Sequence, residues 1–97
     1  EVIVSSFDPV ALQEVAAVSD LPLAFLFDVE SGVATARDLA CEAVHPHYAL
    51  CETAFVAHVH EMGMRVNAWT VRSEETADRL AEAGVDGLIV DEFRFCR

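Results

Sequence analysis

The sequence predicts an α/β domain built on parallel strands, and two observations carry this prediction. Short apolar runs recur at nearly even intervals along the 97 residues, and the stretches between them place apolar residues at helical spacing. This alternation of strands and helices is typical of parallel sheets with right-handed crossovers. A chain of this length holds one domain at most, so we expect 1–97 to form a single unit. The strand-like runs are 2–7, 23–27, 42–45, 66–71 and 87–90.

The composition of these runs indicates which kind of sheet they form. Several are rich in valine, isoleucine or phenylalanine, which favour strands. The first and last runs are almost continuously apolar, as expected for parallel strands that are covered on both faces.

The first helix is predicted directly after the first strand. Asp8 is a candidate N-cap, and Pro9 suits the first helical position. We expect Leu12, Val15 and Ala16 to form its buried face. A shorter helical stretch follows at 33–40.

The third helix is predicted to end at Gly63, a residue type that commonly follows a helix C-terminus. The fourth begins at Ser73 as N-cap and ends at Gly84, with Glu75 and Arg79 spaced to form an ion pair. The residues expected to face inward from these two helices are Phe55, Val56, Val59 and Met62, then Ala77, Leu80 and Ala81.

The charge of the chain excludes several classes of partner. The formal net charge is -11, and the basic residues are all arginines. So acidic a surface repels nucleic-acid backbones and anionic lipid, so neither is an expected partner. No apolar run approaches the ~20 residues of a membrane-spanning helix. The three cysteines form no C-x-x-C, which favours a reducing compartment such as the cytoplasm.

Two architectures fit the alternating order. One is a flavodoxin-like five-stranded sheet, as in receiver domains. The other is part of a (β/α)8 barrel, whose full form needs ~250 residues. The absence of lysine excludes a P-loop, and receiver domains also use a lysine after the last strand. No G-x-G-x-x-G supports a dinucleotide site.

Five motifs, in order, resemble the C-terminal part of a glycerophosphodiester phosphodiesterase barrel. They are "VIVSSF", "AFLFD", "AVHPHYALCETAFVAHVHEMG", "RVNAWTV" and "AEAGVDGLIVD". The resemblance covers essentially the whole chain, and its most specific part is the tryptophan strand followed by "GVDG". The chain departs from the family pattern at Arg72, where asparagine is usual, at Val90, where threonine is usual, and at Glu92-Phe93.

The resemblance implies a TIM-type parallel barrel, of which this chain is a C-terminal portion of about five strands. It also implies metal-dependent hydrolysis of glycerophosphodiesters to glycerol 3-phosphate and an alcohol, with calcium or magnesium. The family's His-Arg-Gly strand, its Glu-x-Asp strand and its second histidine have no counterpart here. By this resemblance the chain carries neither catalytic residues nor metal ligands, and the substrate is a small phosphodiester.

Phe7 and Trp69 are the predicted substrate-binding residues. Strand alternation places Asn67, Trp69 and Val71 on one face, which we expect to line the barrel lumen. Trp69 then lies near the C-terminal end, where barrel active sites form. Phe7 ends its strand at the same rim. A plain core role remains the alternative for both aromatic residues.

His45 and Asp91 end strands and are possible rim residues, although Asp91 also suits a capping role. A metal site is not predicted, because His58 and His60 point apart on a helix and Pro46 interrupts the strand between His45 and His47. The cysteines are expected to be buried and inert.

A second reading is a non-catalytic partial barrel. Five parallel strands without closing partners leave exposed edges. Such a chain is expected to form a homo-oligomer or to associate with the missing part of its barrel. A flavodoxin-like binding domain is the remaining alternative.

Overall fold

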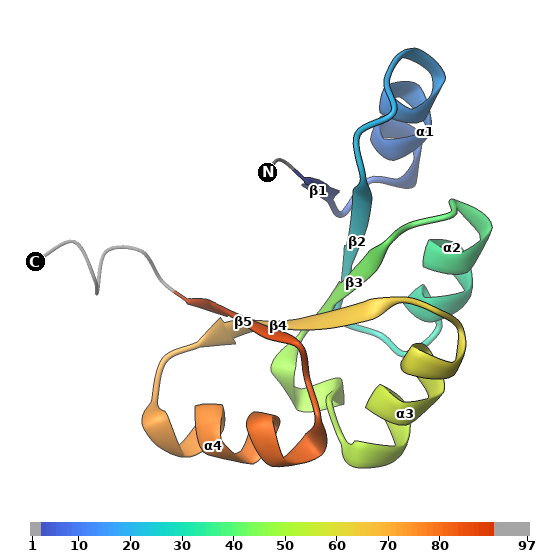
Figure 1. The fold of residues 1–97 in the computed structure, drawn as a ribbon. Helices are drawn as coiled ribbons and strands as arrows, with labels where there is room; N and C mark the ends of the chain where they lie inside the picture. Colours follow the sequence, from blue (N-terminus) through green and yellow to red (C-terminus); the bar gives the residue numbers. More distant parts are fainter. Residues whose placement is uncertain (1–2, 91–97) are drawn as a thin grey trace, which may run out of the picture.

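The computed structural model describes residues 3–90 as a curved parallel sheet with helices on its outer side (Figure 1). Every neighbouring pair of strands is parallel. The strands are β1 (Val4–Ser6), β2 (Leu23–Phe27), β3 (Ala43–Pro46), β4 (Arg65–Val71) and β5 (Gly87–Val90). The helices are α1 (Pro9–Val18), α2 (Gly32–Asp38), α3 (Thr53–Glu61) and α4 (Glu74–Ala83), with a 3-10 turn η1 (Tyr48–Leu50).

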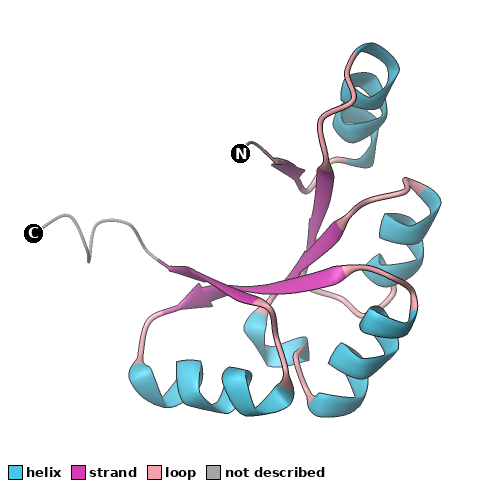
Figure 2. Cartoon of the chain, viewed as in Figure 1, coloured by secondary structure: helices cyan, strands magenta, loops and turns pink. Residues whose placement is uncertain are grey.

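The order of the strands decides between the two expected architectures. The sheet runs β1-β2-β3-β4-β5, so each strand lies beside the next one in sequence. In a flavodoxin-like sheet the strand order is 2-1-3-4-5, so successive strands are added first toward one edge and then toward the other. Helices cover both faces of such a sheet. Here the helices stay on the convex side of the sheet (Figure 2). The partial parallel barrel is therefore confirmed, and the flavodoxin-like alternative is wrong.

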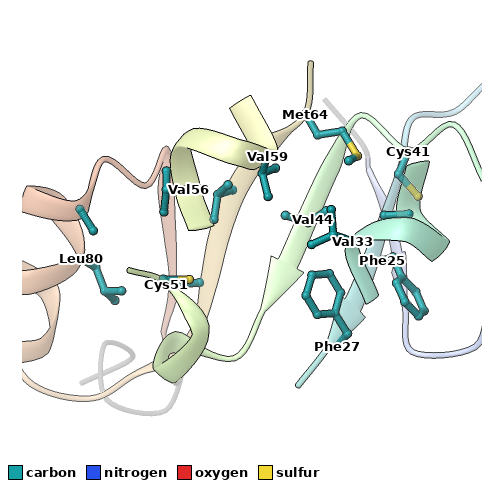
Figure 3. Close-up of a cluster of buried hydrophobic side chains, with 14 of the residues drawn as sticks. Phe25, Phe27, Val33, Cys41, Val44, Cys51, Val56, Val59, Met64 and Leu80 are labelled. Atoms are coloured by element: carbon teal, nitrogen blue, oxygen red, sulfur yellow. The ribbon is translucent and has the colours of Figure 1, made fainter. Parts of the chain in front are cut away.

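The core lies between the convex face of the sheet and the helices (Figure 3). Phe25, Val44 and Val66 contribute from the strands, and Leu12 and Leu80 contribute from the helices. Burying a side chain of this size stabilises a fold by about 1.5–3 kcal/mol. The opposite, concave face of the sheet carries no helix in the described part of the chain.

The predicted caps are confirmed. The Asp8 carboxylate accepts a hydrogen bond from the Val10 N–H at 2.9 Å. Ser73 Oγ accepts one from the Thr76 N–H at 3.2 Å. Gly84 ends α4 with φ 96°, a left-handed conformation that glycine adopts without steric cost.

Two helix-face predictions and one predicted ion pair need correction. Ala16 is exposed, because α1 packs mainly over β1 and β2 and buries chiefly Leu12. Ala81 is exposed as well, since the buried stripe of α4 runs through Leu80 and Ala83. The guanidinium of Arg79 donates instead to the backbone carbonyls of Tyr48, in η1, and Cys51, and the predicted ion pair with Glu75 is not among those formed by residues 3–90.

Within residues 3–90, no helix has the length and apolar character needed to cross a membrane.

Candidate functional site

The concave face carries two layers of side chains, each drawn from β1, β3 and β4 or from the residue directly after one of these strands. The intervening residues, such as Val44 and Val66, point into the helix-covered core, so the residues on either side of them point to the concave face. The lower layer holds Ser5, His45 and Asn67. The upper layer, two residues further along each chain segment, holds Phe7, His47 and Trp69.

The lower layer is a hydrogen-bonded set centred on His45. His45 Nδ1 lies 3.0 Å from Ser5 Oγ. On the other side of the ring, Nε2 lies 3.1 Å from Asn67 Nδ2. His45 is 6% exposed. Cysteines aside, it is the one buried side chain in the described part of the chain that is polar or chargeable. Burial lowers the pKa of the His45 ring, so the ring is neutral at neutral pH.

Small side chains make room for this layer. Ala24 on β2 and Ala43 on β3 are fully buried, so the His45 ring reaches Ser5 across the intervening strand. On β5, Gly87 pairs with Asn67. A Cβ at Gly87 would lie 2.5 Å from Asn67 Oδ1. The absence of a side chain at Gly87 therefore leaves room for the Asn67 side-chain amide.

The upper layer is aromatic and lies at the C-terminal ends of the strands. Phe7 and Trp69 meet edge to face, with ring centroids 5.5 Å apart. His47 meets Trp69 in the same manner at 5.0 Å and stacks on Tyr48 at 4.4 Å. Such pairs stabilise by about 0.5–1.5 kcal/mol beyond their buried area. Phe7 remains 58% exposed, so its ring is available for contact.

Two hydrogen bonds fix the aromatic rings. The indole Nε1–H of Trp69 donates to the His45 carbonyl oxygen at 2.6 Å. The Ala49 N–H donates to His47 Nδ1 at 3.1 Å. His47 therefore holds its proton on Nε2 when the ring is neutral. The two layers are linked, because His45 contacts Ser5 and Asn67 with its ring and Trp69 with its backbone.

The structure brings Phe7 and Trp69 together and places His45 one layer below them. Asp91 lies outside the described residues. Val71, expected on the same face as Trp69, instead lies in the helix-covered core. The pairing of β4 with β5 shifts register between Ala68 and Val71, and such a shift reverses the alternation of faces.

His47 and Ser5 are the members of these layers that sequence reasoning missed as site residues. Pro46 was expected to interrupt the strand, yet it lies within β3. The ladder continues past it, because the His47 N–H donates to the Phe27 carbonyl at 2.9 Å. The signal was present in the two-residue spacing of His45 and His47, which places both on one face of an extended chain.

The opposite end of the strands carries a second polar cluster. Asp86 Oδ2 accepts from the Val66 N–H at 2.8 Å and lies 2.7 Å from His60 Nε2. Burial alone would raise the pKa of Asp86, but the Val66 amide, His60 and Arg65 together hold it below its usual range. Residues at this end of a barrel serve stability, whereas the C-terminal end carries the chemistry. The cluster therefore ties α3 to the sheet.

The two described cysteines are buried, as predicted. Cys41 and Cys51 are free and buried. Burial raises the pKa of the Cys51 thiol to about 11, despite the opposing charge of Arg79. A thiol held this far from ionisation is a poor nucleophile. Cys96 lies outside the described residues.

The residues present do not fit the divalent cation that the resemblance implies. Among residues 3–90, no group of three or more histidine, cysteine, aspartate or glutamate side chains is arranged to hold a metal ion. The concave site offers a neutral ring, an amide, a hydroxyl and aromatic rings, whereas calcium and magnesium prefer carboxylate oxygens. No step is therefore assigned to a metal held by these residues.

The model of the glycerophosphoryl diester phosphodiesterase family matches residues 1–94. No curated protein sequence matches the chain significantly.

Solved structures share the fold. A Silicibacter pomeroyi protein assigned as a glycerophosphoryl diester phosphodiesterase is 26% identical, with a TM-score of 0.82 over 91% of this chain and 34% of its own. An Oleispira antarctica phosphodiesterase, solved with the product sn-glycerol-3-phosphate, is 22% identical, with a TM-score of 0.82 over 91% of this chain and 37% of its own. A Thermotoga maritima glycerophosphodiester phosphodiesterase is 23% identical, with a TM-score of 0.73 over 98% of this chain and 46% of its own. The chain thus spans less than half the length of each of these proteins.

Proposed function

The chain belongs to the glycerophosphoryl diester phosphodiesterase family, and from that premise we propose that it forms the C-terminal portion of a barrel that hydrolyses glycerophosphodiesters to glycerol 3-phosphate and an alcohol. The observation that carries this proposal is the aromatic layer at the C-terminal ends of the strands, where Phe7 and Trp69 meet. Barrel enzymes build their active sites at that end.

In this proposal Phe7 and Trp69 form an apolar wall of the substrate pocket. A glycerol backbone or an alkyl group of the alcohol packs against such a wall and loses contact with water. The indole is held by its hydrogen bond to His45, and the Phe7 ring leans on the indole. Asp91 stays a predicted rim residue outside the described part of the chain.

The chain supplies binding and orientation in this proposal, and the proton transfers belong to residues elsewhere in the barrel. Both ring nitrogens of His45 are already engaged, so this histidine has no free position for exchanging a proton with a substrate. A divalent cation, calcium or magnesium, would neutralise charge on the phosphate when bound by residues outside this chain.

A second candidate function, a non-catalytic association module, is favoured by the uncovered surface. Ile3, Phe7 and Leu88 are large apolar side chains that are at least one-third exposed. They lie on or beside β1 and β5, each of which pairs on one side only within residues 3–90. A second copy, or the remainder of a barrel, would cover them. The free, buried cysteines support a reducing compartment for either function.

The test of the proposed function is a complementation assay. Purified alone, the chain should not hydrolyse glycerophosphocholine with calcium or magnesium, because the family's catalytic histidines and metal carboxylates have no counterpart in it. Co-expressed with the N-terminal part of a family barrel, it should restore turnover. A coupled oxidase assay measures the choline released, both for the chain alone and for the co-expressed barrel.

Trp69→Ala in the complemented barrel should raise KM more than it lowers kcat, since the wall binds the substrate without reacting. Val18→Ala, at the exposed last residue of α1 and away from the aromatic layer, serves as the control. A complemented barrel that forms but shows no turnover would argue for the non-catalytic candidate. Activity that copurifies with the chain alone would contradict the proposal that residues elsewhere in the barrel carry out the proton transfers.

A further inference from the structure

The hydroxyl of Ser5 is placed to face a ligand. Ser5 precedes Phe7 by two residues on the same strand face, so it lies one layer, roughly 7 Å, below the aromatic wall. Its side chain is exposed on the concave face. Its one hydrogen bond within the described residues is the 3.0 Å contact with His45 Nδ1.

The donors and acceptors of the lower layer fix the direction of every proton. An amide nitrogen only donates, so Asn67 Nδ2 donates to His45 Nε2. Nε2 must then be unprotonated, and the neutral ring carries its proton on Nδ1. Nδ1–H donates to Ser5 Oγ. The Ser5 proton is therefore not used inside this layer and can be donated to a further acceptor.

The layer holds this arrangement rigidly. Asn67 is confined by the backbone of Gly87, because a Cβ there would lie 2.5 Å from the amide oxygen. His45 is buried, and its carbonyl is bound by the Trp69 indole. Donors fixed in advance bind a ligand with little loss of side-chain freedom.

We propose that Ser5 contacts the ligand at the floor of the Phe7–Trp69 pocket, and that Asn67 and His45 are positioning residues that turn the Ser5 hydroxyl proton toward a ligand oxygen. This inference rests on the proposed function, and it adds a polar floor to the apolar wall. The ligand chemistry is an oxygen acceptor, supplied either by a glycerol hydroxyl or by a phosphate oxygen.

The first test is ligand binding to the 97-residue chain. The chain has one tryptophan, so intrinsic fluorescence reports on Trp69 alone. We expect sn-glycerol 3-phosphate at millimolar concentration to change this emission. Ser5→Ala should weaken binding about threefold to tenfold, the range for one lost hydrogen bond. The matched control is Ser6→Ala, whose hydroxyl accepts from the Asp8 N–H instead.

Parallel titrations with glycerol and with inorganic phosphate identify which oxygen Ser5 contacts, from the probe whose affinity depends on Ser5. Binding that Ser5→Ala leaves unchanged overturns the role of Ser5 but not the pocket. A wild-type chain that responds to none of the three probes overturns the pocket, and with it the proposed function in this chain.

The second test needs no ligand. Nitrogen NMR distinguishes the two neutral tautomers of histidine, and we expect His45 to be protonated on Nδ1. Asn67→Asp keeps the size of the side chain but replaces the donor with an acceptor, so the proton should move to Nε2 or the ring should become charged. A wild-type His45 protonated on Nε2 would overturn the inference, since Ser5 would then donate to the ring.

Discussion

His45 shows how one buried ring sets the properties of its neighbours. Its two nitrogens are satisfied by one donor and one acceptor, an arrangement that suits the neutral ring only. A protonated ring would also carry a proton on Nε2, so this N–H and the Asn67 amide N–H would face each other as two donors. The hydrogen bond between Asn67 and the buried ring would then be lost. The neutral state is therefore part of the structure of the site.

The first prediction follows from the lowered pKa of His45. The pKa of a histidine lies near 6.5 in the unfolded chain and below that value in the folded protein. Below about pH 6.5 the unfolded state binds more protons, so the free energy of unfolding should fall as the pH falls through this window. Above it, His45 contributes no pH dependence.

Urea unfolding of the wild type between pH 7.5 and pH 5, compared with His45→Gln, measures this effect. The variant should be less stable at pH 7.5, and its disadvantage should shrink toward pH 5. His58→Gln, at an exposed position on α3, is the control for removing a histidine elsewhere on the surface. An equal disadvantage for His45→Gln at both pH values would show that His45 does not titrate during unfolding.

Among the secondary-structure elements, α2 is held by an unusually close approach to the sheet. It begins at Gly32, which is buried against the Phe27 ring. A Cβ at Gly32 would clash with Cβ and Cγ of Phe27. The clash involves the base of the aromatic side chain, which cannot move without displacing the strand that carries it.

Gly32→Ala is therefore expected to destabilise the fold by about 1–3 kcal/mol, the usual cost of overpacking a core. Thermal unfolding followed by circular dichroism measures the change. Ser31→Ala, at the neighbouring exposed position that makes no side-chain capping bond, should change stability by less than about 0.5 kcal/mol. A Gly32→Ala variant as stable as this control would mean that α2 and β2 move apart at little cost.

The elements themselves were largely predictable from local signals. The runs 23–27 and 87–90 coincide with β2 and β5, and the caps at Asp8 and Ser73 form as expected. These features depend on a few adjacent residues. The inward face of β4 was predictable as far as Trp69, and the prediction failed at Val71, where the register shifts against β5.

The layers of the site were less predictable, because they depend on residues far apart in the sequence. Alternation places Ser5, His45 and Asn67 on one face, but does not say that they touch. Contact across β2 requires the small side chain of Ala24, and contact at β4 requires Gly87 beside Asn67. Such combinations become visible only when the strands lie side by side.

Across the whole fold, the sequential strand order makes an open, curved sheet rather than a closed one within residues 3–90. The helices cover the convex face, and the concave face with the two layers stays uncovered in the described part of the chain (Figure 1). Edge strands and uncovered apolar faces are sites of association. The net charge of -11 opposes loose aggregation but leaves the apolar surface in place.

We expect the chain to associate, either with itself or with the remainder of a barrel. Sedimentation at low micromolar concentration should show a dimer or larger species, or a stable complex when the N-terminal part of a family barrel is present. Leu88→Glu places a charge on the 40% exposed Leu88 of β5 and should shift the equilibrium toward monomer. Val18→Glu adds the same charge at the 84% exposed Val18 of α1, away from that edge, and should have no such effect. A well-folded 10.6 kDa monomer that binds neither a second copy nor the N-terminal part of a family barrel would contradict this expectation. The exposed edges would then be stable in water.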